Sequence, residues 1–335
     1  MLAGGSVRAL AYPELVGEPE PGDRVLLNVG ALVMGLGTGG YALVVALPDR
    51  LPPDPDADGT TRDAGHLVKA RYTPLQPIVS GVDEEASPHR AAMAAATSLD
   101  GMPVVTADLH SALPAILAGV HADRPAARVA YVMTDGGALP AWFSRTLDGL
   151  RDHLAGTITA GQAFGGDLEA STVHTALLAA RHVLGADVTV VAQGPGNLGT
   201  GTAWGFSGVA VGEAVNAVAT LGGRPVGALR ISGADRRPRH RGLSHHSLTA
   251  YGKVALLPAD LAVPDPLDPS IADEVEAALA ALARHRIVLV PIDGLDRALR
   301  AGPVRLNTMG RWLDDDHAYF VACAAAGRRA AALLD

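Results

Sequence analysis

From about residue 81 onward, the chain repeats one pattern in which an apolar strand is followed by a loop and then by a helix. The predicted strands include MPVVTADL, ARVAYVMTDG and ADVTVVAQ, and amphipathic stretches such as SALPAILAGV separate them. Continuous apolar strands that alternate with helices of about 10 to 15 residues are typical of parallel βαβ units, whose sheet is covered on both faces. The pattern predicts a three-layer, mostly parallel, doubly wound α/β domain of Rossmann-like type over residues 81–335.

The first 80 residues have a different rhythm. Short predicted strands such as SVRALAY, RVLLNV and YALVVAL are separated by turn residues, which favours a small β-rich module with a barrel-like layer. Residues 48–65 are rich in proline, aspartate and glycine and have little to bury, so we expect an exposed loop there. The sequence therefore predicts two domains, 1–80 and 81–335.

Composition excludes several classes of protein. The chain has 335 residues, a formal net charge of −8 and 4% aromatic residues, which argues against a nucleic-acid partner. No apolar stretch approaches the roughly 20 residues of a membrane helix, and no signal peptide is visible at the N-terminus. Cys323 is the single cysteine, so an intrachain disulfide is impossible and the cytoplasm is the expected compartment.

Polar residues follow five of the predicted strands. In a parallel doubly wound sheet the ligand lies beyond the carboxyl ends of the strands, so we expect these loops to converge on one site. The loops contain Asp108 and His110; Asp135 to Gly137; Gly165, Gly166, Asp167 and Glu169; Gly194 to Gly201; and the cluster RISGADRRPRHRGLSHH at residues 230–246.

The loop GPGNLGTG has glycines at 194, 196 and 199 in G-x-G-x-x-G spacing, between a predicted strand and a predicted helix. Such glycines let backbone N–H groups approach an anion, and Asn197 would add a polar side chain. Pro195 removes one donor, and Asp235 lies about twice as far along the chain as the acidic residue of a dinucleotide site would. The loop therefore favours a phosphate or another anion over a nicotinamide dinucleotide, with a simple chain turn as the alternative.

Carboxylates and imidazoles are the candidate catalytic or metal-binding groups. We expect acid–base roles for His110, His245, His246, Asp108 and Asp167. Asp108, His110, Asp167, Glu169 and His245 also supply the ligand types of a divalent metal site, although no tight metal-binding spacing is present. A structural hydrogen-bond network and, for Asp167 and Glu169, capping of a helix start are the alternatives.

The cluster at 230–246 is cationic in an acidic chain. Lysine occurs only at Lys69 and Lys253, so 25 of the 27 basic residues are arginine, and this bias weakens each arginine as a sign of anion recognition. Ser244 is a predicted N-cap that would place His245 and His246 in the first turn of a helix. An anion clamp, a solvated basic loop and arginines that clamp neighbouring carboxylates all remain open. The anion-clamp hypothesis names Arg236, Arg239, His240 and Arg241.

Six strings resemble an uncharacterised bacterial family, domain of unknown function 3866, over nearly the whole chain. They are LNVGALVMGLGTGGYALVVA, KARYTPLQ, DLHSALPA, TITAGQAFGGDLEA, GPGNLGTGTAWGFSG and RHRGLSHHSLTAYGK. The resemblance implies a bacterial cytosolic protein and brings no activity, cofactor or catalytic residue. Family members often have an additional strand before VRALAY, so either this chain lacks that strand or its true start lies upstream of Met1.

These observations leave two functions open. The first is an enzyme, a metal-assisted or acid–base transferase or hydrolase, that binds a small phosphorylated or carboxylated molecule at the composite site. The alternative is a non-catalytic binding or scaffold protein, a homodimer, that grips an acidic partner with its basic loop. The reaction, the substrate, the presence of a metal and the oligomeric state stay open at this stage.

Overall fold

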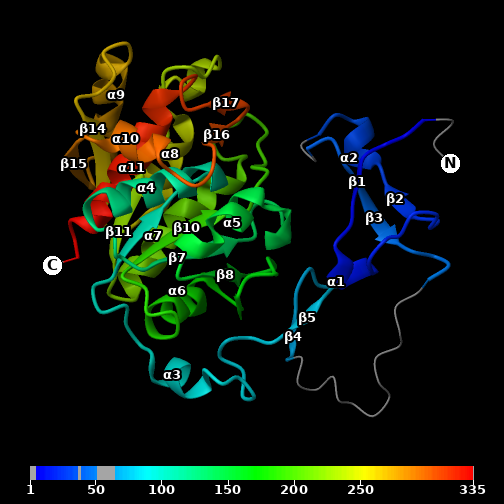
Figure 1. The fold of residues 1–335 in the computed structure, drawn as a ribbon. Coiled ribbons are helices and arrows are strands. Elements are labelled where there is room, and N and C mark those ends of the chain that lie inside the picture. The colour runs from blue at the N-terminus through cyan, green and yellow to red at the C-terminus, as the bar shows by residue number, and fades with distance from the viewer. Residues whose placement is uncertain (1–4, 37–38, 51–64, 335) are drawn as a thin grey trace. The chain divides into compact units, whose positions relative to one another are not determined.

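The computed structural model describes residues 5–36, 39–50 and 65–334, and these form two compact units (Figure 1). One unit spans Met1–Ser80 and the other spans Gly81–Asp335. Of the predicted exposed loop at 48–65, residues 51–64 lie outside the described residues. No described helix combines the length and the apolar character that spanning a bilayer requires.

The larger unit is built on an eight-stranded sheet in which every neighbouring pair is parallel. The strand order is β15-β14-β11-β6-β10-β7-β8-β9. The strands are β6 (Pro103–Thr106), β7 (Val129–Thr134), β8 (Gly156–Ala160), β9 (Leu168–Ala170), β10 (Val188–Gln193), β11 (Arg224–Ala228), β14 (Asp260–Asp265) and β15 (Arg286–Pro291). The predicted parallel α/β sheet is confirmed.

Helices cover both faces of this sheet, which explains why its strands carry apolar side chains on both sides. On β6, Val105 packs into one core and Val104 into the core on the opposite face. The first face is covered by α4 (Leu113–Asp123), α5 (Arg145–Leu150), α10 (Leu295–Arg300) and α11 (His317–Ala331). The second face is covered by α3 (Arg90–Ala95), α6 (Val173–His182), α7 (Ala210–Thr220) and α9 (Ala272–Leu279).

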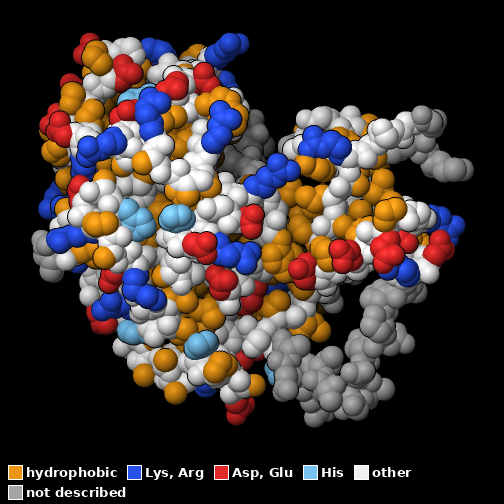
Figure 2. All heavy atoms as spheres, in the orientation of Figure 1, with side chains coloured by type: hydrophobic (Ala, Val, Ile, Leu, Met, Phe, Trp, Pro, Cys, Tyr) orange, Lys and Arg blue, Asp and Glu red, His pale blue; other side chains and the backbone are white. Residues whose placement is uncertain are grey.

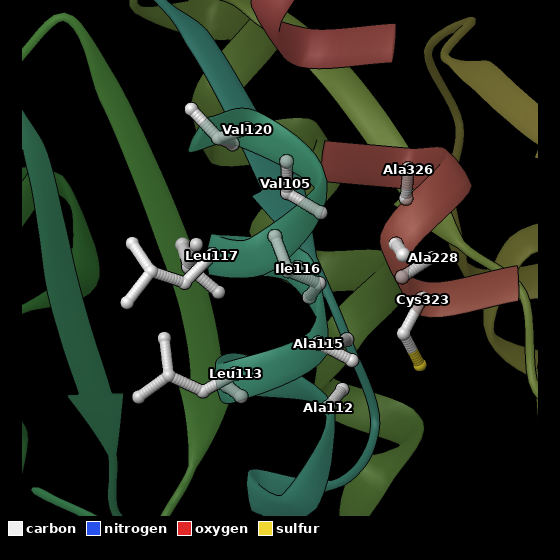
Figure 3. Packing of buried hydrophobic residues seen from close by; sticks show 14 of the residues in the cluster. Val105, Ala112, Leu113, Ala115, Ile116, Leu117, Val120, Ala228, Cys323 and Ala326 are labelled. Atoms are coloured by element: carbon white, nitrogen blue, oxygen red, sulfur yellow. The ribbon is translucent and has the colours of Figure 1, made fainter. Parts of the chain in front are cut away.

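Helices α4 and α11 pack in close contact on the first face (Figure 3). A Cβ atom at Gly119 would overlap the carbonyl oxygen of Ala324, and one at Gly327 would overlap the carbonyl oxygen of Ile116. Figure 3 shows Ile116 and Ala115 of α4 in the same layer as Cys323 and Ala326 of α11. The two helices approach this closely because glycine stands at both contact points.

The strand order reverses between β6 and β10, which are parallel neighbours in the sheet. The chain leaves β6 toward α4 on the first face and leaves β10 toward α7 on the second face. Loops that diverge to opposite faces mark the position where ligands of such folds bind, at the carboxyl ends of the two strands. The cavity lined by Asp108 and Gln193 at this position has a volume of only about 10 Å³.

Short elements complete the larger unit. Two antiparallel hairpins are β12 (Ile231–Ser232) with β13 (Gly242–Leu243), and β16 (Asn307–Thr308) with β17 (Arg311–Trp312). The remaining elements are α8 (His245–Thr249), the π-helical turn η7 (Ala250–Val254), and the 3₁₀ turns η2 (His110–Ala112), η3 (Ala141–Phe143), η4 (Arg151–His153), η5 (Ser207–Val209), η6 (Pro238–His240) and η8 (Ala280–Leu282).

The described part of the smaller unit contains small sheets only. Strands β1 (Ala9–Leu10), β3 (Ala42–Ala46) and β2 (Leu26–Asn28) form one sheet, and β4 (Leu67–Val68) pairs with β5 (Ile78–Val79). Two single-turn helices, α1 (Pro13–Val16) and α2 (Gly30–Val33), connect them. The predicted barrel-like layer is therefore not confirmed.

Candidate functional site at the carboxyl edge of the sheet

The histidines of the cluster are brought together by a hairpin that follows β11. Arg230 comes two residues after β11 ends, and β12 and β13 then form the hairpin whose connection carries η6 and His240. Ser244 is the N-cap of α8, as predicted, and its Oγ accepts a hydrogen bond from the backbone N–H of His246 at 3.2 Å. The hairpin thus folds His240 back onto the first turn of α8.

Three imidazole rings lie together at this point. The ring centroid of His240 is 4.8 Å from those of both His245 and His246, and the latter two are 4.5 Å apart. One ring nitrogen from each histidine lies within 4.8 Å of the other two. His240 and His246 are buried and His245 is half-buried, so the cluster is partly accessible through His245.

Asp108 reaches the cluster from the end of β6. Its Oδ2 lies 3.2 Å from His246 Nδ1 and 3.7 Å from Arg230 Nη1. Arg230 Nη1 is also 3.3 Å from His246 Nδ1, but one nitrogen cannot serve both neighbours. We assign the proton to Nδ1, donated to the carboxylate, because a charge-assisted hydrogen bond is the stronger of the two. In this tautomer, the lone pair of the ring is on Nε2 of His246.

The charge of the cluster is set by burial and by its arginines. Burial, followed by the charges of Arg230 and Arg237, lowers the pKa of His240 to about 3. Burial, followed by His246 and Arg239, lowers the pKa of His245 to about 4. Burial opposes ionisation of Asp108, but the hydrogen bond from His246 and the charge of Arg230 outweigh it and lower the pKa. Near neutral pH, His240 and His245 are therefore uncharged beside an ionised Asp108.

A second carboxylate, Asp235, fixes the loop that carries His240. Its oxygens accept hydrogen bonds from Arg230, Arg237 and Arg311, and Arg311 of β17 also bonds Asp316. Burial raises the pKa of Asp235, but the hydrogen bonds and charge of Arg237, together with the charge of Arg311, lower it far below its usual value. Arginines that clamp a neighbouring carboxylate were one of the alternatives that the sequence left open for this cluster, and Arg237 with Asp235 forms such a clamp.

The glycine-rich loop lies against the cluster but does not form a dinucleotide-binding turn. Residues Gly199 and Phe206 form an isolated antiparallel bridge, so the loop continues as a hairpin before η5 begins at Ser207. Asn197 Oδ1 accepts hydrogen bonds from Gln193 Nε2 and Ser207 Oγ, so it ties the loop to the end of β10. A Cβ at Gly194 would overlap the carbonyl oxygen of Ala138, whereas one at Gly196 would meet open space.

The arginines that were expected to bind an anion divide into engaged and exposed side chains. Arg241 contacts Glu274 and the carbonyl oxygens of Gly233 and Ser270, so its role is to hold the loop. Arg236 and Arg239 are exposed, and among the described residues no ion pair engages either. Arg239 Nη2 would lie 3.6 Å from a Cβ at Gly201, so its guanidinium lies beside the glycine-rich loop.

His110 does not belong to the histidine cluster and has other hydrogen-bond partners. Its Nδ1 lies 2.9 Å from the hydroxyl of Tyr131 and its Nε2 lies 2.6 Å from Ser144 Oγ. Burial lowers the pKa of His110 to about 4, which makes it a weak base near neutral pH. Ser144 also caps α5 by accepting a hydrogen bond from the backbone N–H of Leu147. These bonds make His110 part of a buried polar network.

Asp167 and Glu169 lie far from the histidine cluster, and the prediction that they stand at a helix start is wrong. Glu169 lies in β9, and α6 begins only at Val173. Leu168 pairs with Ile158, so Asp167 lies beside the amino end of β8, where it accepts a hydrogen bond from Thr157 N at 2.8 Å. Strand β9 is four positions from β6, a separation of about 19 Å at about 4.8 Å per strand. The set Asp108, His110, Asp167, Glu169 and His245 is therefore not assembled as one metal site.

Asp167 instead lines a cavity of about 470 Å³ with Ser144, Trp142 and Arg145. Glu169 is buried, and its carboxylate accepts hydrogen bonds from Gly165 N and Thr159 Oγ1.

Over the larger unit, acidic and basic side chains are interspersed on the face drawn in Figure 2.

The fold and this site define a doubly wound α/β protein with a histidine cluster at the switch point of its sheet. The family model described as "Protein of unknown function (DUF3866)" matches residues 8–327, and the chain belongs to this family. No curated protein and no solved structure matches the chain.

Proposed function

We propose that this protein is an enzyme that hydrolyses or transfers a group of a small anionic substrate at the histidine cluster. The observation that carries the proposal is the contact between His246 Nδ1 and Asp108 Oδ2 at 3.2 Å. It lies near the point where the strand order reverses. A carboxylate that holds an imidazole in one tautomer is a recurring arrangement of acid–base sites. The contact lies at the carboxyl ends of parallel strands, the position at which ligands generally bind in doubly wound folds, and this supports the proposal.

An anion is favoured as the ligand because the arginines of the cluster exceed its carboxylates. Arg230 and Arg237 are matched by Asp108 and Asp235. Arg239 and Arg236 add two exposed guanidinium groups on the same loop, and Arg239 acts electrostatically on His245. Guanidinium groups match phosphate and carboxylate oxygens in geometry and charge.

The histidines of the cluster can offer lone pairs in this setting. His240 and His245 are uncharged near neutral pH, so each can accept a hydrogen bond from a ligand or bind a metal ion, although their lowered pKa values make them weak bases, as His110 is. The glycine-rich loop adds small residues beside Arg239, so a ligand can approach the backbone there. Hydrolysis or group transfer at a phosphoryl or acyl centre uses these components better than hydride transfer does.

A thermal-shift screen of phosphorylated and carboxylated small molecules, inorganic phosphate included, tests this proposal. A ligand at 100 times its dissociation constant adds about 2.7 kcal/mol to the free energy of unfolding. We expect Arg239→Gln to abolish the shift and Arg297→Gln, an exposed arginine on α10, to leave it intact. Failure of every compound, or an unchanged shift in Arg239→Gln, would contradict the assignment.

Turnover separates an enzyme from the alternative, a homodimeric binding or scaffold protein. Compounds that stabilise the protein are incubated with it and the products are identified by mass spectrometry. Product formation that is lost in Asp108→Asn supports catalysis. Binding without product supports the alternative.

We also propose the cytoplasm as the compartment, because the single cysteine lies buried in α11 and can form no disulfide within the chain. Fractionation of cells that express the protein tests this assignment.

A further inference from the structure

We propose that His240, His245 and His246 bind one divalent transition-metal ion of the zinc type. None of the sequence patterns predicted this trio as metal ligands, because His240 was expected to contact an anion. The three residues offer one ring nitrogen each, and these nitrogens lie within 4.8 Å of one another. Three imidazoles are the ligand set of one class of catalytic zinc site.

The spacing is close to what a metal requires. Zinc–nitrogen bonds of about 2.0–2.1 Å in tetrahedral geometry set ligand nitrogens about 3.3 Å apart. Side-chain rotations that move each ring nitrogen by about 1 Å close the difference between this distance and the observed spacing. Their placement on η6 and on the first turn of α8 joins two elements, so a bound metal would fasten the hairpin connection to the helix.

Two of the three rings already have an outer partner on one nitrogen. His246 Nδ1 lies 3.2 Å from Asp108 Oδ2, and His240 Nδ1 lies 2.8 Å from Ser244 Oγ. Metal-bound histidines usually bond a carboxylate, carbonyl or hydroxyl through the nitrogen that does not touch the metal. This arrangement leaves Nε2 of both rings for the ion.

The third ring supplies an independent observation. His245 Nε2 is buried and has no hydrogen-bond partner among the described residues. Polar atoms that are buried without a partner are rare, and each calls for an explanation. A metal ion bound to this nitrogen provides one, since it takes the lone pair that no protein group satisfies.

The charges around the trio decide what completes the coordination shell. Asp108 and Asp235 balance Arg230 and Arg237, while Arg239 stays exposed beside His245. A divalent ion would add to this positive surplus, so a fourth ligand that is an anion is favoured over a neutral one. This last step rests on the proposed function, whereas metal binding itself does not.

The test is metal binding by the full chain without any substrate. The protein is stripped with a chelator, titrated with Zn²⁺ by isothermal calorimetry and loaded with Co²⁺ for visible absorption. We expect one Zn²⁺ per chain and the intense absorption of four-coordinate Co²⁺. We expect His240→Ala and His245→Asn each to weaken Zn²⁺ binding by 100-fold or more. His174→Ala, an exposed histidine on α6, is the matched control.

Circular dichroism of each variant shows whether it is folded, and the Co²⁺ spectrum of the wild-type chain needs no variant at all. Absence of Zn²⁺ binding, a Co²⁺ spectrum without the four-coordinate bands, or wild-type affinity in the folded His245→Asn variant would overturn the site. If anions shift the melting temperature while no metal binds, the metal site fails and the proposed function stands. If a metal binds while no anion does, the metal site stands and the proposed function fails.

Discussion

Phe206 lies flat against His246, with ring centroids 3.8 Å apart and planes only 3° from parallel. Phe206 closes the bridge of the glycine-rich loop with Gly199, so this stacking joins the loop to the histidine cluster. The contact explains why Phe206 stands at the base of this glycine-rich loop.

Replacement of Phe206 by leucine should therefore loosen both the loop and His246. Stacked aromatic pairs contribute about 1 kcal/mol beyond their buried area, and we expect Phe206→Leu to lose about that much stability in urea unfolding. Trp204→Leu is the matched control, since Trp204 lies on the same loop but is 57% exposed. Equal losses in the two variants would show that the stacking contributes nothing specific.

The contact between α4 and α11 predicts a large effect from a single methyl group. Gly119→Ala would place a Cβ against the Ala324 carbonyl, and forced overlap in a packed core costs about 1–3 kcal/mol. Gly302→Ala is the control, because a Cβ there would have only ordinary contacts. The free energy of unfolding in urea measures both. A Gly119→Ala variant as stable as wild type would show that the helices can separate at no cost.

The depressed pKa of His110 predicts acid sensitivity of the folded state. Between pH 6.5 and 4 the unfolded chain protonates this residue while the native chain does not, so the unfolded state binds more protons. Stability is therefore lost as the pH falls from 6.5 to 4, by about 3 kcal/mol from this residue alone, and no further below 4. His240 and His245 act in the same direction.

Measurement of the unfolding free energy against pH checks this. His110→Gln should give a flatter profile between pH 4 and 6.5 than wild type, whereas His174→Gln on the exposed face of α6 should keep the wild-type profile. Parallel profiles for wild type and His110→Gln would mean that folding does not lower the pKa of His110.

Removal of the carboxylate at position 235 should release the loop that carries His240. Asp235→Asn leaves the buried Arg230 with only Asp108 as a counter-charge, and breaking a buried ion pair costs about 3–5 kcal/mol. Asp314→Asn removes an exposed pair with Arg300 and should change stability little. Urea unfolding distinguishes the two. A mild effect at both positions would contradict the clamp role of Asp235.

Much of the larger unit could be predicted because a strand that is buried on both faces has a recognisable sequence pattern. Runs such as Val188 to Gln193 carry apolar residues on both faces of the strand, and this predicts a parallel sheet whatever the strand order. The rule that ligand loops gather at the carboxyl edge also predicted the meeting of Asp108 with His246.

The exceptions have physical reasons. The connection from β8 to β9 has seven residues and no helix, so Asp167 returns to the amino end of the sheet. A parallel pair usually needs a longer crossover, and no local pattern marks this one. The contact of His240 with His245 depends on a hairpin of two-residue strands, which is too short to leave a periodic signal. The short strands of residues 1–80 likewise predicted a barrel-like layer that the small sheets do not confirm.

The most direct test of the proposed site is a crystal structure of the protein grown with inorganic phosphate. We expect phosphate within hydrogen-bond distance of Arg239 and beside His245, at the carboxyl edge of the sheet. Phosphate bound only in the cavity lined by Ser144, Trp142 and Asp167 would contradict the account and move the functional site to the other end of the sheet.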